Sequence, residues 1–281
     1  MVITKSGFVA IVGRPNGGKS TLLNSILGTK VSIVSNKAQT TRTQVRGVLN
    51  REDTQIVFVD TPGIHKPKTA LGSRLNDTAT DSLAGVDKVL FVIDATAPFG
   101  TGDQFVADRL PSDAIVVVNK VDIASPDQVI TQLQRASELD LADYFPVSAK
   151  SGKGVDELVK SLLSSMPEGP ALYPEDVVTD VPDAFWVAEL VREQLFTVMR
   201  QELPYSIATR VTEWDWPRIR CEILVERDSQ KGMVIGQKGE VLRSVGIAVR
   251  EQLVPGAYLE LVVRVAKDWQ RQTKALERLG Y

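Results

Sequence analysis

The chain has 281 residues, 43% of them hydrophobic and 24% charged, and its net charge at pH 7 is −2. This length predicts two compact domains, and the composition excludes a disordered or fibrous protein. The charge balance also excludes capture of nucleic acid by general electrostatic attraction, so any nucleic-acid site must be local.

Residue usage narrows the class of protein further. The single cysteine, Cys221, excludes an internal disulfide, fits a reducing compartment and lies in an apolar run typical of a buried thiol. The single histidine, His65, excludes a metal site with several histidines. No apolar run reaches about 18 residues and no secretory signal opens the chain, so we expect a cytoplasmic protein that does not span a membrane.

The first part of the chain, up to Met166, alternates short β-branched apolar runs with amphipathic stretches of helical length. This alternation predicts βα units around a mostly parallel sheet, an α/β fold. The expected strands are 8–12, 55–59, 88–93, 114–118 and 144–147, with an edge strand near 45–49.

The proline-rich segment between Pro167 and Pro182 predicts an extended linker. Beyond it, the pattern predicts a helix, two strands, two helices, a third strand and a terminal helix, which together form a small α+β domain. The first helix is expected over 183–202, and the strands over 206–213, 218–226 and 259–265. We therefore expect a first domain at 1–166, a linker at 167–182 and a second domain at 183–281.

A phosphate-binding loop follows the first predicted strand. Its sequence, Gly13-Arg14-Pro15-Asn16-Gly17-Gly18-Lys19-Ser20, fits the pattern GxxxxGK[ST] and leads into a helix that begins near Thr21. In such a loop the backbone N–H groups bind phosphate, the lysine places a cation on the β- and γ-phosphates, and the serine ligates Mg²⁺. The motif, including Thr21, therefore predicts a nucleoside triphosphate site and by itself admits either ATP or GTP.

A second motif, Asp60-Thr61-Pro62-Gly63, ends the strand predicted over 55–59. There Asp60 is expected to reach Mg²⁺ through water, and the Gly63 N–H to meet the γ-phosphate. The next residue is Ile64, where many GTPases carry a glutamine that orients the attacking water. We therefore expect slow hydrolysis without help.

Two further motifs decide which base is bound. In Asn119-Lys120-Val121-Asp122, the Asp122 carboxylate accepts hydrogen bonds from guanine N1–H and the 2-amino group, which adenine cannot supply. Asn119 is expected to tie the base edge to the phosphate loop, and the Lys120 stem to cover one face of the ring. Ser148-Ala149-Lys150 then presents the Ala149 N–H to guanine O6. These motifs favour guanine.

The polar stretch 30–46 predicts a switch loop with Gln39-Thr40-Thr41-Arg42 at its centre. The Thr41 hydroxyl is the candidate that completes the Mg²⁺ shell when a γ-phosphate is bound, Thr40 is the second candidate, and an ordinary solvated loop is the alternative. The Asn16 side chain, beside the β- and γ-phosphates, suggests a K⁺ site that replaces an arginine finger.

In the second domain, the turn Gly236-Gln237-Lys238-Gly239 lies between two predicted helices and follows Val234-Ile235. This order is typical of a KH domain, although a plain helix-to-helix turn is the commoner meaning of such a pattern. Phosphates of a nucleic acid would meet Lys231, Lys238 and Arg243. Base specificity would come from an apolar groove lined by Ile223, Val225, Ile235 and Leu242. Trp214, Trp216 and Trp269 are expected to pack on the domain, with base stacking as the alternative.

These motifs together resemble those of the Era family of GTPases, and the resemblance extends over nearly the whole chain. Its most specific part is His65-Lys66-Pro67-Lys68, and one departure is Gly17, where the family usually has valine. The resemblance implies a type II KH domain that binds the 3′ end of small-subunit (16S) ribosomal RNA, and a role in late assembly of the small ribosomal subunit. It also implies peripheral association with the inner face of the cell membrane, and we expect a monomer.

Two other functions fit parts of the pattern. A signalling GTPase with an adaptor domain is disfavoured because no lipidation motif or basic amphipathic anchor is evident. A KH protein with a vestigial nucleotide site is opposed by the intact Lys19, Ser20, Asp60 and Asp122.

Overall fold

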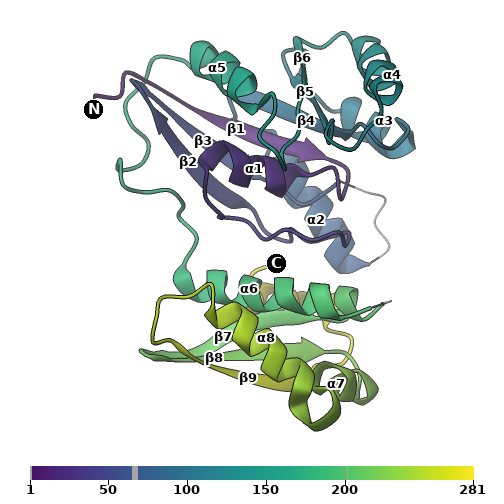
Figure 1. Ribbon diagram of the computed structural model, residues 1–281, viewed down its shortest axis with the longest axis vertical. Helices are drawn as coiled ribbons and strands as arrows, with labels where there is room; N and C mark the ends of the chain where they lie inside the picture. The colour runs from purple at the N-terminus through teal and green to yellow at the C-terminus, as the bar shows by residue number, and fades with distance from the viewer. Residues whose placement is uncertain (1, 65–68, 201) are drawn as a thin grey trace. The chain divides into compact units, whose positions relative to one another are not determined.

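The computed structural model describes residues 2–64, 69–200 and 202–281. The chain forms two compact units, one made up mainly of residues up to Asp180 and the other of Val181–Tyr281 together with Thr69–Leu71 (Figure 1). The motif His65-Lys66-Pro67-Lys68 lies outside the described residues. Within the part of the chain that the structure describes, no helix has the length and apolar character needed to cross a membrane.

The first unit is a six-stranded sheet in the order β2-β3-β1-β4-β5-β6. All neighbouring strands are parallel except β2, which runs antiparallel to β3. Each strand lies close to its expected position. The bounds are β1 (Lys5–Gly13), β2 (Val45–Arg51), β3 (Thr54–Asp60), β4 (Lys88–Asp94), β5 (Ile115–Asn119) and β6 (Asp143–Pro146).

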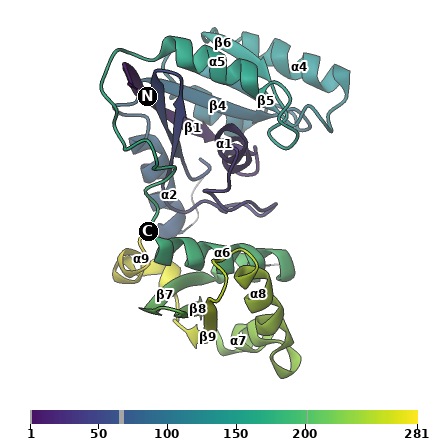
Figure 2. The same ribbon diagram turned by 60° about the vertical axis from the view of Figure 1, so that its left-hand side comes forward.

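Helices cover both faces of this sheet, as Figure 2 shows. On one face, Ala79, Val106 and Ala136 of three helices share a buried cluster with Phe91 of β4. The α/β prediction is confirmed for this unit. Its helices are α1 (Lys19–Leu27), α2 (Ala70–Asp81), α3 (Thr101–Ala107), α4 (Pro126–Ser137) and α5 (Val155–Ser165).

The segment 167–180 is not a free linker, because it lies along the first unit. The Ser6 backbone N–H donates to the Pro167 carbonyl at 3.1 Å, and the Val48 N–H donates to the Val178 carbonyl at 2.8 Å. The fully buried Gln55 accepts hydrogen bonds at Oε1 from two backbone N–H groups of this segment. Prolines keep the segment extended, and its backbone groups then find partners on strands β1, β2 and β3.

The second unit is a three-stranded sheet, β7-β8-β9, with β7 antiparallel and β9 parallel to β8. Its first helix ends at Val198, earlier than expected, and the order of elements is otherwise as predicted. The elements are α6 (Asp183–Val198), β7 (Ala208–Asp215), β8 (Arg218–Val225), α7 (Asp228–Ile235), α8 (Glu240–Arg250), β9 (Tyr258–Val265) and α9 (Thr273–Arg278).

Two side chains that were expected to be buried, Trp269 and Cys221, lie in the interior of this unit. Trp269 is 1% exposed and its Nε1 donates to the Ser206 carbonyl at 2.9 Å, so it packs and is not available to stack on a base. Cys221 is fully buried in β8, and burial raises the pKa of its thiol to about 12. Such a thiol stays protonated and unreactive at neutral pH.

Candidate nucleotide site and nucleic-acid interface

The phosphate loop occupies the turn between β1 and α1, and its glycines are required by close backbone approach. Gly13 and Gly18 have φ of 148° and 94°, values that residues with a side chain rarely adopt. A Cβ on Gly13 would lie 2.3 Å from the Val92 carbonyl oxygen, and one on Gly18 would lie 2.2 Å from Asn119 Nδ2. The loop therefore packs directly against the ends of β4 and β5.

Gly17 has a different reason to be small. A Cβ at this position would lie 3.3 Å from the Val92 carbonyl oxygen and 3.4 Å from the Arg14 carbonyl oxygen, inside ordinary van der Waals contact. The loop therefore lies closer to β4 than a larger side chain would easily allow.

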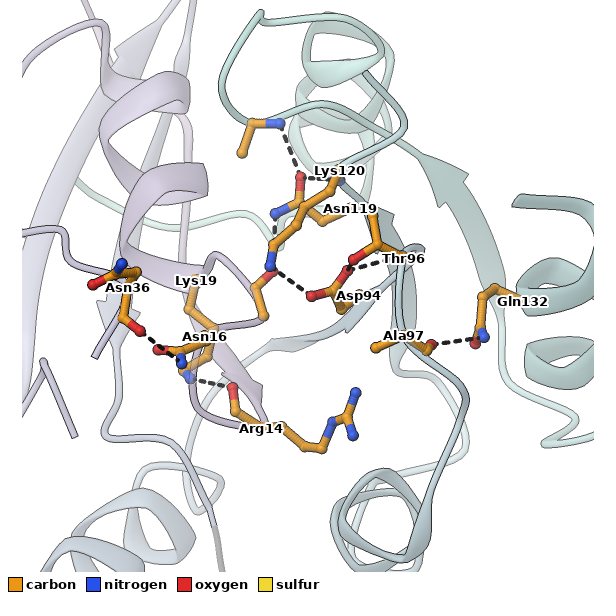
Figure 3. Close-up of polar contacts among 12 residues, drawn as sticks. Arg14, Asn16, Lys19, Asn36, Asp94, Thr96, Ala97, Asn119, Lys120 and Gln132 are labelled. Atoms are coloured by element: carbon orange, nitrogen blue, oxygen red, sulfur yellow. Dashed lines mark hydrogen bonds and ion pairs between the residues drawn. The ribbon is translucent and has the colours of Figure 1, made fainter. Parts of the chain in front are cut away.

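Lys19 lies at the start of α1 and is only 5% exposed. Its Nζ donates to the carbonyl oxygens of Gly13 at 3.2 Å and of Arg14 at 3.1 Å, under the phosphate loop (Figure 3). Burial lowers the pKa of Lys19 to about 8, and the negative charge of Asp60 acts in the opposite direction. The ammonium is thus held by neutral acceptors at the place where phosphate oxygens bind in such loops.

The Arg14 side chain has a partner outside the phosphate loop. Its Nε pairs with the buried Asp103 of α3 at 2.8 Å, and Figure 3 shows the side chain directed away from Lys19. The backbone of Arg14 shapes the loop, but its charge is committed to α3. The sequence did not predict the ion pair between Arg14 and Asp103, because nothing in the spacing of residues links Asp103 to the phosphate loop.

Hydroxyl groups from the phosphate loop and from the switch loop converge on Asp60 at the end of β3. Its Oδ2 accepts hydrogen bonds from Ser20 Oγ at 2.6 Å, Ser32 Oγ at 2.9 Å and Thr41 Oγ1 at 3.4 Å, and the Ser20 and Thr41 hydroxyls lie 2.9 Å apart. Burial raises the pKa of Asp60, and the nearby Lys19 charge and these hydroxyls oppose that effect. The cluster joins the phosphate loop, the switch loop and the sheet.

This donor set fits Mg²⁺. Its members are hard oxygen donors, which suit this cation. Within the described residues, the buried Asp60 Oδ1 also has no hydrogen-bond partner, so one carboxylate oxygen remains available to a cation or its water. Ser32 is the member that sequence reasoning missed, since it lies in a short apolar run that carries no recognisable motif.

The two candidate threonines of the switch loop have different hydrogen-bond partners. Thr40 Oγ1 donates to the Lys37 carbonyl at 2.7 Å and lies 2.6 Å from Ser35 Oγ, so its hydroxyl serves the loop's own turn. Thr41 is the residue that reaches Ser20 and Asp60. Of the other predicted switch residues, Gln39 has a left-handed φ of 59° and Arg42 is 2% exposed.

A cavity of about 470 Å³ opens between the phosphate loop and the switch loop. Gly63 lines it and lies against the phosphate loop, where an added Cβ would be 2.7 Å from the Pro15 nitrogen. Ile64 is 1% exposed and packs in the sheet core, so it offers the cavity no polar group. The other residues that line the cavity include Asn16, Gly18, Lys19, Ser20, Thr21, Gln39, Thr40, Thr41 and Lys120.

The predicted base-binding motifs meet at the ends of β5 and β6. Asn119 Nδ2 donates to the Gly17 carbonyl at 3.0 Å, as expected for a tie to the phosphate loop. Ser148 Oγ donates to Asp122 Oδ1 at 2.8 Å and orients this exposed carboxylate. The Ala149 N–H, expected to meet guanine O6, donates instead to Asn119 Oδ1 at 2.9 Å in this structure.

Lys120 has a partner that the sequence did not indicate. Its Nζ lies 2.5 Å from Asp94 Oδ2 at the end of β4, and Asp94 Oδ1 accepts from Thr96 (Figure 3). Asp94 ends a strand between two motif-bearing strands, and that position is the signal that could have identified it. Lys150, the last residue of its motif, is exposed.

In the second unit, the glycine turn between α7 and α8 has a strained, open backbone. Gly236 has φ of 74° and ψ of 172°, Lys238 has φ of 52°, and Gly239 has φ of 78°. Lys238 and Gln237 are exposed at the tip. A groove of about 560 Å³ lies beside them, and both Arg243 and Glu240 line it. The turn therefore presents a cation and backbone groups to a nucleic-acid backbone.

Of the four residues expected to line an apolar groove beside this turn, Ile223 and Val225 lie in the core instead, whereas Ile235 and Leu242 remain partly exposed. Ile223, Val225 and Val234 are fully buried in the core of the unit, with Ile235 and Leu242 packed against them. Their apolar pattern came from the core face of a strand and a helix, and periodicity alone does not distinguish that face from a groove. Lys231 is half-buried in α7.

Comparisons with known proteins agree with both units. A family model described as "50S ribosome-binding GTPase" matches residues 8–120, and a KH domain model matches residues 202–270. The curated GTPase Era of Nocardioides sp. (strain ATCC BAA-499 / JS614) is 43% identical over 301 residues, which cover 99% of this chain and 96% of that protein.

Two solved structures match along the full length. One is a variant of Era from Aquifex aeolicus bound to GDP and AlF4⁻, with a TM-score of 0.93, 42% identity and 99% of both chains covered. The other is Era in complex with MgGDPNP and nucleotides 1506–1542 of 16S ribosomal RNA, with a TM-score of 0.94, 41% identity and 99% of both chains covered.

Proposed function

Because this chain belongs to the Era family of GTPases, we propose that it is a GTP-driven switch that binds small-subunit ribosomal RNA near its 3′ end. The process that this activity serves would be late assembly of the small ribosomal subunit. The similar Era whose structure contains MgGDPNP and a 16S ribosomal RNA fragment supports the RNA partner.

The observation that carries the switch proposal is the meeting of Ser20, Thr41 and Asp60. These residues come from the phosphate loop, the switch loop and β3, and their oxygens lie within hydrogen-bond distance of one another. Mg²⁺ held there would neutralise charge on the β- and γ-phosphates. Loss of the γ-phosphate would remove a reason for Thr41 to stay at the site, and the loop would be released.

Hydrolysis in this site depends on positioning more than on a protein base. Ile64 is buried and apolar, so no carboxamide orients water at that position. Asn16 Nδ2 donates to the Asn36 carbonyl at 3.1 Å, which brings the phosphate loop and the switch loop together beside the cavity (Figure 3). A K⁺ ion bound by the Asn16 side-chain oxygen and the Asn36 carbonyl would supply the positive charge of an arginine finger.

The glycine turn of the second unit is the proposed RNA contact. Lys238 is exposed at its tip, and Arg243 lines the adjoining groove. These cations would pair with phosphates, while the open backbone of Gly236 and Gly239 allows close approach. Val234 would contribute only by holding α7 in the core.

The test is fluorescence anisotropy with a labelled single-stranded RNA that matches the 3′ end of 16S ribosomal RNA. A scrambled RNA, GDP and a non-hydrolysable GTP analogue complete the comparison. We expect sequence-selective binding that changes with the nucleotide. Equal weak binding in all samples would contradict the RNA switch and leave the GTPase in place.

A pair of charge-matched variants locates the contact. Lys238→Gln should weaken RNA binding by about tenfold, because it removes a phosphate contact. Lys160→Gln removes the same charge from an exposed position on α5 and should leave RNA binding unchanged.

A further inference from the structure

A groove of about 460 Å³ lies at the end of the second unit away from the glycine turn. Trp186 of α6 lines it together with Trp214 and Trp216, which lie at the tip of the β7–β8 hairpin. Figure 1 shows this hairpin tip and the loop after α8 at the same end of the unit, opposite α7. We refer to the space between these residues as the tryptophan groove.

The sheet register explains why Trp214 faces this space. Trp214 and Ile219 are direct partners across β7 and β8, so both side chains lie on the face that carries the helices. Ile219 is 1% exposed and closes the floor of the groove. Leu253, which follows α8, lines the groove as well. The floor of the groove therefore belongs to the sheet of the folded unit.

The aromatic rings are unusually open to solvent for their size. Trp214 is 43% exposed and Trp216 is 50% exposed, whereas Trp269 of the same unit is buried. Exposed apolar patches on a folded unit mark surfaces that bind a partner, and tryptophan is enriched at the centres of such interfaces.

Charge indicates what kind of partner fits. Asp183, in the first turn of α6, is the single charged residue among the described residues that line the groove, and no lysine or arginine lines it. A nucleic-acid strand needs cations for its phosphates, so this surface suits RNA poorly. A cation is attracted both by the faces of the tryptophans and by the Asp183 carboxylate.

We propose that the tryptophan groove binds an arginine side chain on a basic segment of a partner protein. The guanidinium stacks between indole rings and pairs with Asp183, and the apolar floor receives the methylene stem. This site is separate from the nucleotide cavity and from the glycine turn, so the protein would hold its RNA and a basic protein segment at different places on one unit.

The probe is a fluorescein-labelled octapeptide of glycine and serine with two arginines, compared with a twin in which citrulline replaces each arginine. Citrulline keeps the shape of arginine and lacks its charge. Anisotropy with the full chain should show about tenfold tighter binding of the arginine peptide, the size expected of a desolvated cation–π contact with a paired carboxylate. Equal binding of the two peptides would overturn the proposal.

Variants assign the effect to the groove. Asp183→Asn and Trp216→Leu should each remove most of the preference for arginine. Asp228→Asn, which removes an exposed acid from the first turn of α7, should keep the preference. The urea midpoint followed by circular dichroism should show that the variants are folded. If Trp216→Leu weakens binding of single-stranded RNA and neither peptide binds, the groove stacks bases and the proposal is wrong.

Discussion

The Lys120 ammonium and the Asp94 carboxylate form an ion pair across the ends of β5 and β4, with 2.5 Å between Nζ and Oδ2. Burial raises the pKa of Asp94, but the hydrogen bonds from Lys120 and Thr96 outweigh it and lower that pKa overall. The carboxylate is thus charged at neutral pH and fixes the end of the Lys120 side chain. Asp94 thereby positions the stem that is expected to cover the guanine ring.

Asp94→Asn should therefore weaken GDP binding by about three- to tenfold, chiefly by faster dissociation, because it removes a charge-assisted contact. Stopped-flow release of a fluorescent GDP analogue measures this. Asp113→Asn is the matched control, since the Asp113 carboxylate pairs with Lys88 at the other end of β4, with 2.7 Å between Oδ2 and Nζ. Equal dissociation rates for Asp94→Asn and the unaltered chain would refute the positioning role.

The choice of threonine in the switch loop can be tested directly. Thr41 meets Ser20 and Asp60, whereas Thr40 bonds within its own turn. Thr41→Ala should abolish the protection of the loop from proteolysis that a non-hydrolysable GTP analogue and Mg²⁺ provide, and Thr41→Ser should restore it. Thr40→Ala should keep the protection. Unchanged protection in Thr41→Ala would assign the metal contact elsewhere.

The strands and the motif residues that follow them could be predicted, because contiguous motifs and strand periodicity are visible in the sequence. Parallel strands end at one edge of a sheet, so residues after β1, β3 and β5 had to meet. Pairings between distant residues were not predictable: Arg14 with Asp103, Lys120 with Asp94, and Ser32 with Asp60 depend on packing in three dimensions. For the same reason the segment 167–182 was predicted as a linker, although strands of the first unit supply hydrogen-bond partners to residues 167–180.

The K⁺ proposal predicts a cation-dependent rate. Turnover of GTP should be at least about tenfold faster in K⁺ than in Na⁺, since a preorganised positive charge beside the phosphates typically contributes that much or more. Asn16→Ala should remove the difference. Asn36→Ala should retain it, because only the backbone carbonyl of Asn36 is used. Steady-state phosphate release in the two salts at equal ionic strength decides the matter, and equal rates would exclude a K⁺ role.

Lys19 predicts how nucleotide binding varies with pH. Its pKa is about 8 in the nucleotide-free protein, and bound phosphates favour the charged ammonium and raise that pKa. Between the two values, binding takes up a proton, so affinity for GDP should fall as the pH rises above about 8. Titration calorimetry at pH 8.5 in two buffers of different ionisation enthalpy should reveal uptake approaching one proton.

A control for this prediction is Lys37→Gln, which changes another lysine that lines the same cavity and should leave the proton uptake intact. Calorimetric heats of binding that do not depend on the buffer would contradict the assignment to Lys19.

The lowered pKa of Lys19 also affects stability. The unfolded chain, with Lys19 near 10.5, binds more protons between about pH 8 and 10.5 than the folded chain, so the nucleotide-free protein should gain stability as the pH rises through this window.

The two glycines of the exposed turn should differ in how well they tolerate a side chain. A Cβ on Gly236 would lie 2.5 Å from Val241 Cγ2, whereas one on Gly239 would meet nothing within 4 Å. Both residues have positive φ, so alanine strains the backbone by about 1 kcal/mol at Gly239 and by at least as much at Gly236, whose φ of 74° and ψ of 172° are adopted almost only by glycine. At Gly236 a steric clash adds about 1–3 kcal/mol, since the start of α8 must shift.

Urea unfolding followed by tryptophan fluorescence measures this difference in the right unit, because Trp186, Trp214, Trp216 and Trp269, the four tryptophans of the chain, all lie after Val181. Gly236→Ala should lower the free energy of unfolding by about 2–4 kcal/mol and Gly239→Ala by about 1 kcal/mol. Equal destabilisation by the two variants would contradict both the clash with Val241 and the greater backbone strain at Gly236.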